Sequence, residues 1–467
     1  MLPPSRSVAV FVLAANAFDS LLLSAFVIQP ALADPPKVAS LTPADGAVDV
    51  DPGMTEMRIV FDRDMITGQQ SVCGGGPTFP KLTEKPIWVD ARTLVLKVEL
   101  QPDHSYEMAL NCPASGRYFR SADGEELAFM PWRFTTASKR SPKEQRAINE
   151  KSLKSLLAVL KAHYSYYDRK GVDWAAQAKS HRRKIVAAKN TQTWIRRVVK
   201  MLEPAEDPHL WMSFGGKVTA THQRNYRPNF DFRGLEKELG PLQRRNDNTF
   251  TTRTDDGIGY ILISSWSNGL RPQIEELQGI LAEMKDTKGL IIDVRPNGGG
   301  DELLARSVAA WFVEGDKVYS KNCYRDAKSK GGFGEMFDRV IEGNRPPKRY
   351  ANPVVVLMGP ANLSSCESFL LMMKQGEHVT LMGSRSGGSS GNPRPHRLEN
   401  GVEIVVPSWK DFLPDDRLLE GNGVDPDQVV KVKLRELAAG DPIVLGALKL
   451  LREKSNHTAP VSPQAGR

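Results

Sequence analysis

The segment Gly289-Leu-Ile-Ile-Asp-Val-Arg-Pro-Asn-Gly-Gly-Gly-Asp301 is the part of the sequence from which the fold is most readily inferred. Its first half, Gly289–Val294, is a short apolar run typical of a buried strand. The three glycines that follow let a backbone approach a ligand closely and point its amides into a concavity, although an unusual turn is the alternative explanation. The segment lacks the Lys-Ser/Thr pair of a phosphate loop and the G-x-G-x-x-G spacing of a dinucleotide site.

Strand-like and helix-like patterns alternate on both sides of this segment. The short apolar runs are Gly259–Ser264, Pro353–Met358 and Val379–Met382, and helical patterns cover Pro272–Met284, Glu302–Phe312 and Glu367–Lys374. This alternation predicts βαβ units with a buried, largely parallel sheet. We assign this α/β core to residues 214–452 and expect the tail, residues 453–467, to be disordered.

Two different units precede the core. Residues 37–137 contain short alternating strands separated by turns, which predicts an all-β sandwich. Residues 144–213 have apolar residues at helical spacing and predict a helical subdomain. Its basic residues are Lys179, Arg182, Arg183, Lys184, Arg196, Arg197 and Lys200. This basic excess indicates either a solvated helix face or a contact with an anionic cell-envelope surface.

The composition excludes several classes of protein. Of the 467 residues, 40% are hydrophobic and 25% are charged, which is typical of two or three globular domains and excludes a disordered, collagen-like or polytopic membrane protein. The 63 Lys and Arg residues exceed the 55 Asp and Glu residues by eight, which is no nucleic-acid signature. We therefore predict no nucleic-acid partner, and the sequence indicates no oligomeric state.

Residues 1–33 predict a secretory signal. They carry only Arg6 and Asp19 as charges, contain two apolar stretches and end in Ala31-Leu-Ala33, so we expect cleavage after Ala33 and a periplasmic or extracellular protein. An uncleaved anchor is the alternative, which the charge of Asp19 and the helix breaker Pro30 disfavour.

Export permits disulfides, and the four cysteines fall into two groups. Cys73 and Cys112 lie in the predicted sandwich, and we name them as a candidate disulfide. Two small buried thiols are the alternative. Cys323 and Cys366 lie far downstream.

Ser364 is the candidate nucleophile. The segment 353–369 runs from an apolar strand through a tight Gly-Pro-Ala-Asn turn into a helix, so that Ser364 lies at the N-terminus of the helix. Free amides and the helix dipole favour the negative charge of an oxyanion there. An N-cap that only begins the helix is the alternative role. Cys366, two residues later, is interpreted as a small core residue.

A serine nucleophile needs a base, and His209 is the best candidate among the eight histidines. It alone lies in a short turn-like context, Pro204-Ala-Glu-Asp-Pro-His209, between a helix and a strand. A histidine that titrates near neutral pH is a suitable base for a serine.

In order along the chain, these pieces resemble the tail-specific, or C-terminal processing, serine peptidase family, which includes the tricorn core. The resemblance covers roughly residues 144–451. Its motifs stand here as Asp207-Pro-His209, Asp293-Val-Arg-Pro-Asn-Gly-Gly-Gly300, Ser364-Ser-Cys-Glu367 and Glu420-Gly-Asn-Gly-Val-Asp-Pro-Asp427. The sandwich segment resembles bacterial Ig-like domains, which implies a spacer or binding role. It carries that likeness at Thr42–Ala47, Phe61–Met65 and Trp132–Thr136.

The family resemblance implies a ClpP/crotonase-like core and assigns roles in it. Ser364 is then the nucleophile, His209 is the base that Glu420 orients, and amides near Gly299 and Ser365 form the oxyanion hole. Many bacterial members use a lysine about twenty-five residues after the serine, where this chain has Ser389.

The chain departs from the family at two further places. Pro208 occupies the position of the serine that orients the histidine in the tricorn-like branch. The segment from His209 to Tyr260 is too short for the inserted PDZ domain of many relatives. Tail-specific cleavage is therefore not expected to follow from the resemblance.

The sequence thus predicts an exported serine-type peptidase that needs no cofactor and acts on a peptide or protein. No H-E-x-x-H or paired C-x-x-C indicates a metal. Two alternatives stay open: a non-catalytic ligand-binding protein on the same scaffold, and a hydrolase of a non-peptide ester or amide of the envelope.

Overall fold

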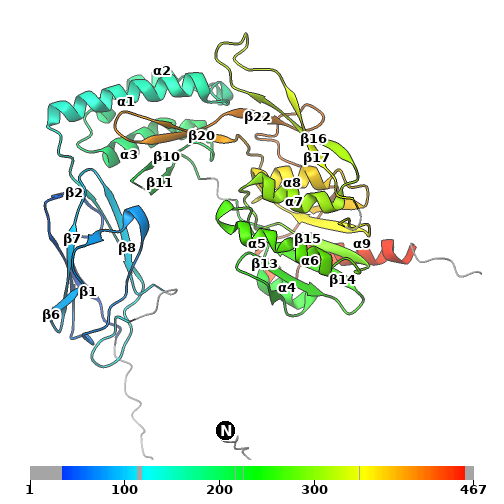
Figure 1. Cartoon of the computed structure of the whole chain (residues 1–467), viewed down its shortest axis with the longest axis horizontal. Helices are drawn as coiled ribbons and strands as arrows, with labels where there is room; N and C mark the ends of the chain where they lie inside the picture. The colour runs from blue at the N-terminus through cyan, green and yellow to red at the C-terminus, as the bar shows by residue number, and fades with distance from the viewer. Residues whose placement is uncertain (1–33, 113–117, 216, 224–225, 346–347, 458–467) are drawn as a thin grey trace, which may run out of the picture.

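The computed structural model describes residues 34–457 except 113–117, 216, 224–225 and 346–347. It contains a β-sandwich, a helical unit and an α/β core (Figure 1). The predicted signal at residues 1–33 lies outside the described residues. Within the described ranges, no helix has the length and apolar character needed to cross a membrane.

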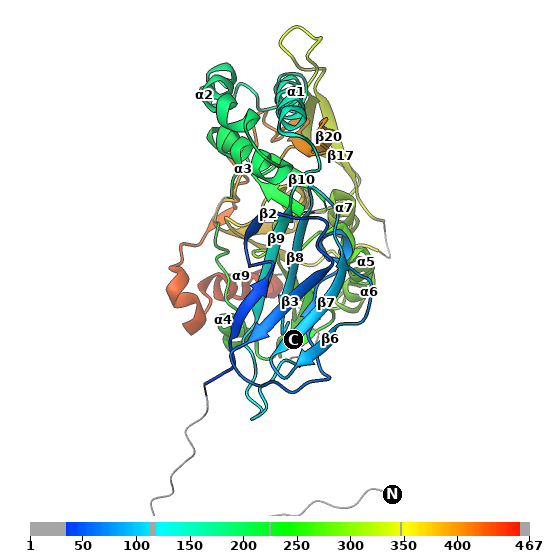
Figure 2. The ribbon, with the colours of Figure 1, turned by 90° about the vertical axis from the view of Figure 1, so that its left-hand side faces the viewer.

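The N-terminal unit is a sandwich of two sheets that face each other (Figure 2). One sheet contains β1 (Val38–Thr42), β3 (Glu56–Phe61), β7 (Thr93–Glu99), β5 (Lys81–Leu82) and β6 (Ile87–Asp90); the other contains β2 (Ala47–Val50), β9 (Met130–Thr136), β8 (Ser105–Leu110) and β4 (Val72–Cys73). A disulfide links Cys73 to Cys112, with an S–S distance of 2.12 Å. The relation to bacterial Ig-like domains stays a prediction.

The helical unit consists of α1 (Pro142–His163), α2 (Trp174–Val186) and α3 (Thr191–Leu202). Ser141 begins α1 through a capping box, because the Glu144 carboxylate accepts the Ser141 N–H at 2.8 Å while the Ser141 hydroxyl accepts the Glu144 N–H. The helices therefore begin at Pro142, two residues before the predicted boundary at residue 144. The predicted basic residues lie on α2 and α3, and their contact with an anionic surface stays a prediction.

A sheet built from two distant parts of the chain completes the helical unit. Its order is β11 (Lys217–Ala220), β10 (Trp211–Phe214), β21 (Glu403–Pro407) and β20 (Pro393–Arg397). Ile404 and Val406 of β21 pack in the same apolar cluster as Leu156 and Trp194 of the helices. The predicted boundary between the helical subdomain and the core, at residues 213/214, assigns β20 and β21 to the core. The structure places these two strands in the sheet of the helical unit, because β21 pairs with β10. Pairing between strands so far apart in sequence leaves no local pattern.

The core contains a seven-stranded sheet within the described residues. The strand order is β12 (Gln243–Arg244), β13 (Thr249–Arg253), β14 (Ile258–Ile263), β15 (Gly289–Asp293), β18 (Val354–Met358), β19 (Val379–Gly383) and β23 (Gln428–Val429). The five strands from β14 to β23 are parallel to their neighbours, and β12 and β13 are antiparallel. The strand β14 is buried along its whole length, as expected for a parallel strand covered on both faces.

Helices cover both faces of this sheet. One face packs against α5 (Arg271–Glu275), α6 (Leu277–Glu283), α7 (Glu302–Ala309) and α8 (Ser365–Met373), and the other against α4 (Phe232–Leu239) and α9 (Pro442–His457). The helix predicted over Pro272–Met284 is thus split into α5 and α6. The tail predicted as disordered from residue 453 begins inside α9, since the buried Leu448 and Leu451 anchor that helix. Residues 458–467 lie outside the described residues.

A small three-stranded sheet lies beside α7 and α8 (Figure 1). It consists of β17 (Phe337–Glu342), β16 (Asp316–Tyr324) and β22 (Trp409–Phe412). Because β22 follows β21 closely, the chain between β19 and β22 extends from the core to the helical unit and back.

Arg295, two residues after the end of β15, lies at the centre of a buried charged cluster. Its guanidinium pairs with Asp293 at 2.6 Å (Nη2–Oδ2) and with Asp441 at 2.8 Å (Nη1–Oδ2), and all three side chains are fully buried. It also donates to the Asn229 carbonyl at 2.9 Å. Since Asp441 directly precedes α9, this buried cluster fixes the end of β15 and the start of α9 together.

Replacing Arg295 by methionine tests this role. The variant Arg295→Met leaves two buried carboxylates without their cation, and we expect it to lower the free energy of unfolding by about 3–5 kcal/mol. Denaturant unfolding measures the loss. The matched control is Arg233→Met, whose exposed pair with Asp231 contributes less than about 1 kcal/mol. Equal losses in the two variants would contradict a structural role for the Arg295 cluster.

Candidate active site

Ser364 occupies a strained position between β18 and α8. Its backbone has φ 54° and ψ −128°, a region that costs a residue other than glycine roughly 1–3 kcal/mol. The Ser364 N–H donates both to the Ser389 carbonyl at 2.7 Å and to the Glu367 carboxylate at 3.2 Å. The surrounding bonds therefore hold the half-buried candidate serine in a sharp strand-to-helix turn, a geometry that the nucleophile elbow of serine hydrolases also uses.

Gly299 brings the glycine loop against this turn. It has φ +105°, and a Cβ added there would lie 2.7 Å from the Leu363 carbonyl oxygen and 3.0 Å from the Ser364 Cβ. Only glycine allows this approach. The three glycines thus serve close backbone packing beside the candidate nucleophile.

The Gly299 amide is engaged within its own turn. Its N–H donates to Asn297 Oδ1 at 2.9 Å and so belongs to the turn itself. The next residue, Gly300, lines a cavity of about 280 Å³ together with Ser364 and Ser365. The Ser365 hydroxyl donates to the Gly300 carbonyl at 2.6 Å, which joins the two segments whose amides lie beside the cavity.

His209 is held at its backbone and at its ring. Asp207 Oδ1 accepts the His209 N–H at 2.8 Å, and the Tyr164 hydroxyl donates to Asp207 Oδ2 at 2.9 Å. The ring Nδ1 is 2.9 Å from the Ser389 hydroxyl. Because the Ser389 carbonyl also accepts the Ser364 N–H, a single residue contacts both the candidate base and the candidate nucleophile.

Glu420 lies buried beside the loop after β19. Its carboxylate pairs with Arg169 at 3.0 Å (Nη1–Oε1) and accepts the Ser390 N–H at 3.0 Å. These two contacts tie the loop after β19 to Arg169 of the helical unit. The predicted action of Glu420 on the imidazole stays a prediction.

Glu367 is a further residue of the candidate site. In the sequence it stood out only as the last residue of the motif Ser364-Ser-Cys-Glu367. Its fully buried carboxylate accepts the Ser386 hydroxyl at 2.5 Å and the amides of Gly388 and Ser389, each at 2.8 Å. Burial raises the pKa of Glu367 to about 8, while these donors favour its charged form. Together with its bond to Ser364, this carboxylate fastens the loop after β19 to the start of α8.

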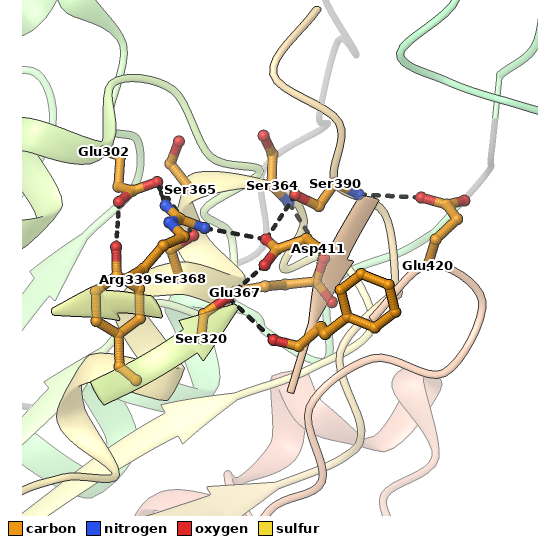
Figure 3. Close-up of polar contacts among 12 residues, drawn as sticks. Glu302, Ser320, Arg339, Ser364, Ser365, Glu367, Ser368, Ser390, Asp411 and Glu420 are labelled. Atoms are coloured by element: carbon orange, nitrogen blue, oxygen red, sulfur yellow. Dashed lines mark hydrogen bonds and ion pairs between the residues drawn. The ribbon is translucent and has the colours of Figure 1, made fainter. Parts of the chain in front are cut away.

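Charged and hydroxyl groups surround the cavity. Figure 3 shows the Ser364 and Ser365 hydroxyls pointing to the same side, and Arg339 between Glu302 and Asp411. Arg339 Nη1 lies 3.2 Å from Asp411 Oδ2, which also accepts the Ser390 hydroxyl at 2.8 Å. Paired charges therefore lie next to a cavity that is lined mainly by polar residues.

Cys366, two residues after Ser364, does not line the cavity. Cys366 is fully buried in the apolar core, as predicted, and burial raises the pKa of its thiol well above the usual value. Such a thiol stays protonated and is a poor nucleophile. Among the residues that the structure describes, no cluster of His, Cys, Asp and Glu could hold a metal ion.

Comparison with known proteins relates part of the core to a peptidase family. The model of peptidase family S41 matches residues 257–430. The carboxy-terminal processing protease CtpB of Bacillus subtilis is 25% identical over 174 residues, which are 37% of this chain and 34% of that protein. The carboxyl-terminal-processing protease of Synechocystis is 26% identical over 201 residues, 43% of either protein. The chain thus spans less than half the length of these relatives.

A solved structure extends the likeness beyond the core. A protein of Parabacteroides merdae, provisionally described as a peptidase, is 25% identical with a TM-score of 0.56, over 65% of this chain and 96% of that chain. The segment from residue 257 to residue 430, which carries the glycine loop and Ser364, is a domain of peptidase family S41.

Proposed function

We propose that this protein is an exported serine peptidase with Ser364 as its nucleophile and His209 as its general base. The observation that carries the proposal is the position of Ser389, which contacts Ser364 through its carbonyl and His209 through its hydroxyl. Ser389 thus links two residues far apart in sequence, each of a type that acyl transfer uses, which supports the proposal.

The proposed reaction follows the ordinary course of acyl transfer. His209 Nε2 takes the hydroxyl proton of Ser364 as its oxygen attacks the peptide carbonyl. The N–H groups of Gly300 and Ser365 stabilise the resulting oxyanion at the positive end of α8. Collapse of this intermediate breaks the C–N bond, and His209 returns the proton to the leaving amine. Water, activated by the same imidazole, then releases the acyl group from Ser364.

A peptide substrate is supported by the family and by the names of the relatives, which are carboxy-terminal processing proteases. The described part of the segment between His209 and Tyr260 forms β10, β11, α4, β12 and β13. We therefore propose cleavage without substrate capture by a PDZ domain in this segment. Export is supported by the signal-like residues 1–33 and by the disulfide of the sandwich.

Labelling by a fluorophosphonate tests the proposed pair of catalytic residues. We expect the protein to be labelled at Ser364, because only an activated hydroxyl attacks the probe rapidly. Ser364→Ala abolishes the label, and His209→Ala slows labelling by about 10²–10⁴-fold, the usual contribution of a general base. Mass mapping of the labelled peptide and the rate of labelling are the measurements.

The same experiment separates the alternatives. A folded protein that takes no label would contradict the proposal and favour a non-catalytic binding protein on this scaffold. Label on Ser364 with hydrolysis of small esters, but none of unfolded proteins, would favour a hydrolase of envelope esters or amides.

The strained backbone of Ser364 gives a second prediction. Glycine adopts a positive φ without steric cost, so we expect Ser364→Gly to be about 1 kcal/mol more stable than Ser364→Ala, although both variants are inactive. Denaturant unfolding of the two variants measures this difference. A Ser364→Gly variant less stable than Ser364→Ala would show that this backbone is not strained.

A further inference from the structure

We propose that Ser389 is a positioning residue that holds His209 in the tautomer required of a general base. The inference rests on the proposed function of Ser364 and His209 and adds a third residue to it. Ser389 lies where many relatives of the resembled family have a lysine base. Here its hydroxyl acts on the imidazole instead of on the substrate.

The contacts of Ser389 fix its hydroxyl in space. The residue is fully buried, its N–H donates to the Glu367 carboxylate at 2.8 Å, and its carbonyl accepts the Ser364 N–H at 2.7 Å. Because the N–H and the carbonyl of Ser389 are both hydrogen-bonded and the residue is buried, its side chain has little room to change rotamer. Its Oγ lies 2.9 Å from Nδ1 of His209.

This contact determines which ring nitrogen is available for catalysis. When the imidazole donates its Nδ1 proton to the Ser389 oxygen, Nε2 keeps a lone pair that can accept the proton of Ser364. In the opposite arrangement, the Ser389 hydroxyl donates to Nδ1 and the ring proton lies on Nε2, where it prevents His209 from acting as a base. The proposal requires the first arrangement.

The local sequence explains why a distant residue has this task. Pro208 has no hydroxyl with which to orient the neighbouring ring, and Asp207 is bound to the His209 N–H and to Tyr164. The loop after β19, fastened by Glu367, supplies a hydroxyl at Nδ1 of the ring.

Two measurements on the full chain test the proposal. The first is ¹⁵N NMR of the imidazole of His209, assigned by its loss in His209→Ala, which we expect to show a proton on Nδ1. The second is the rate of fluorophosphonate labelling in Ser389 variants. We expect Ser389→Ala to slow labelling about 100-fold, because small misplacements of a catalytic group cost that much, while Ser389→Thr restores most of the rate.

Ser152→Ala is the matched control. Ser152 is also a fully buried serine, and its hydroxyl accepts a single backbone N–H, from Asn400, in the helical unit. We expect this variant to be labelled at the wild-type rate, which separates loss of positioning from loss of any buried serine hydrogen bond. If peptide hydrolysis is measured, the Ser389→Ala variant loses kcat and retains KM.

The possible failures are distinguishable. A proton on Nε2 of His209 in the wild type, or wild-type labelling of Ser389→Ala, overturns the role of Ser389. A wild-type protein that takes no label overturns the proposed function. The NMR spectra of the His209 imidazole then test only whether Ser389 holds the ring. In that case an Nδ1 proton that shifts in Ser389→Ala but not in Ser152→Ala supports the contact.

Discussion

The buried carboxylate of Glu367 is the interaction on which the arrangement of the site depends. It accepts the N–H of Ser364 on its own helix and the N–H groups of Gly388 and Ser389 on the loop after β19. A buried amide without an acceptor costs free energy, and Glu367 supplies an acceptor to amides of both segments. One side chain thereby fixes the candidate nucleophile and the loop that reaches the candidate base. The S-x-x-E spacing places this carboxylate one helical turn after the serine, where it can make all these bonds.

The rest of the fold brings other segments to this point. The Arg295 cluster fixes the end of β15, from which the glycine loop turns toward Ser364. The pairing of β10 with β21 brings the His209 turn close to the loop after β19. The buried charges of the Arg295 cluster and the strained backbone of Ser364 both cost free energy of folding. Such costs are typical of sites that are rigid before substrate binds.

Local patterns predicted the elements of the core well, because buried parallel strands and the turns after them are encoded in adjacent residues. The serine at the start of α8 and the glycines beside it were predictable for the same reason. The partners of Gly299 and Glu420 were not predictable from local patterns, since they depend on which groups come together in space: Gly299 donates to Asn297, and Glu420 pairs with Arg169. Ser389 looked like a lost lysine, because its contact with His209 spans 180 residues of sequence.

The most direct test is a crystal structure of the fluorophosphonate adduct of the whole protein. We expect a phosphorus–oxygen bond to Ser364, with the phosphoryl oxygen about 2.7–3.1 Å from the N–H groups of both Gly300 and Ser365. We also expect Nε2 of His209 to face the Ser364 oxygen while Nδ1 stays on Ser389. A phosphoryl oxygen bound elsewhere, or an imidazole turned away from Ser364 in the adduct, would show that these residues do not form one catalytic site.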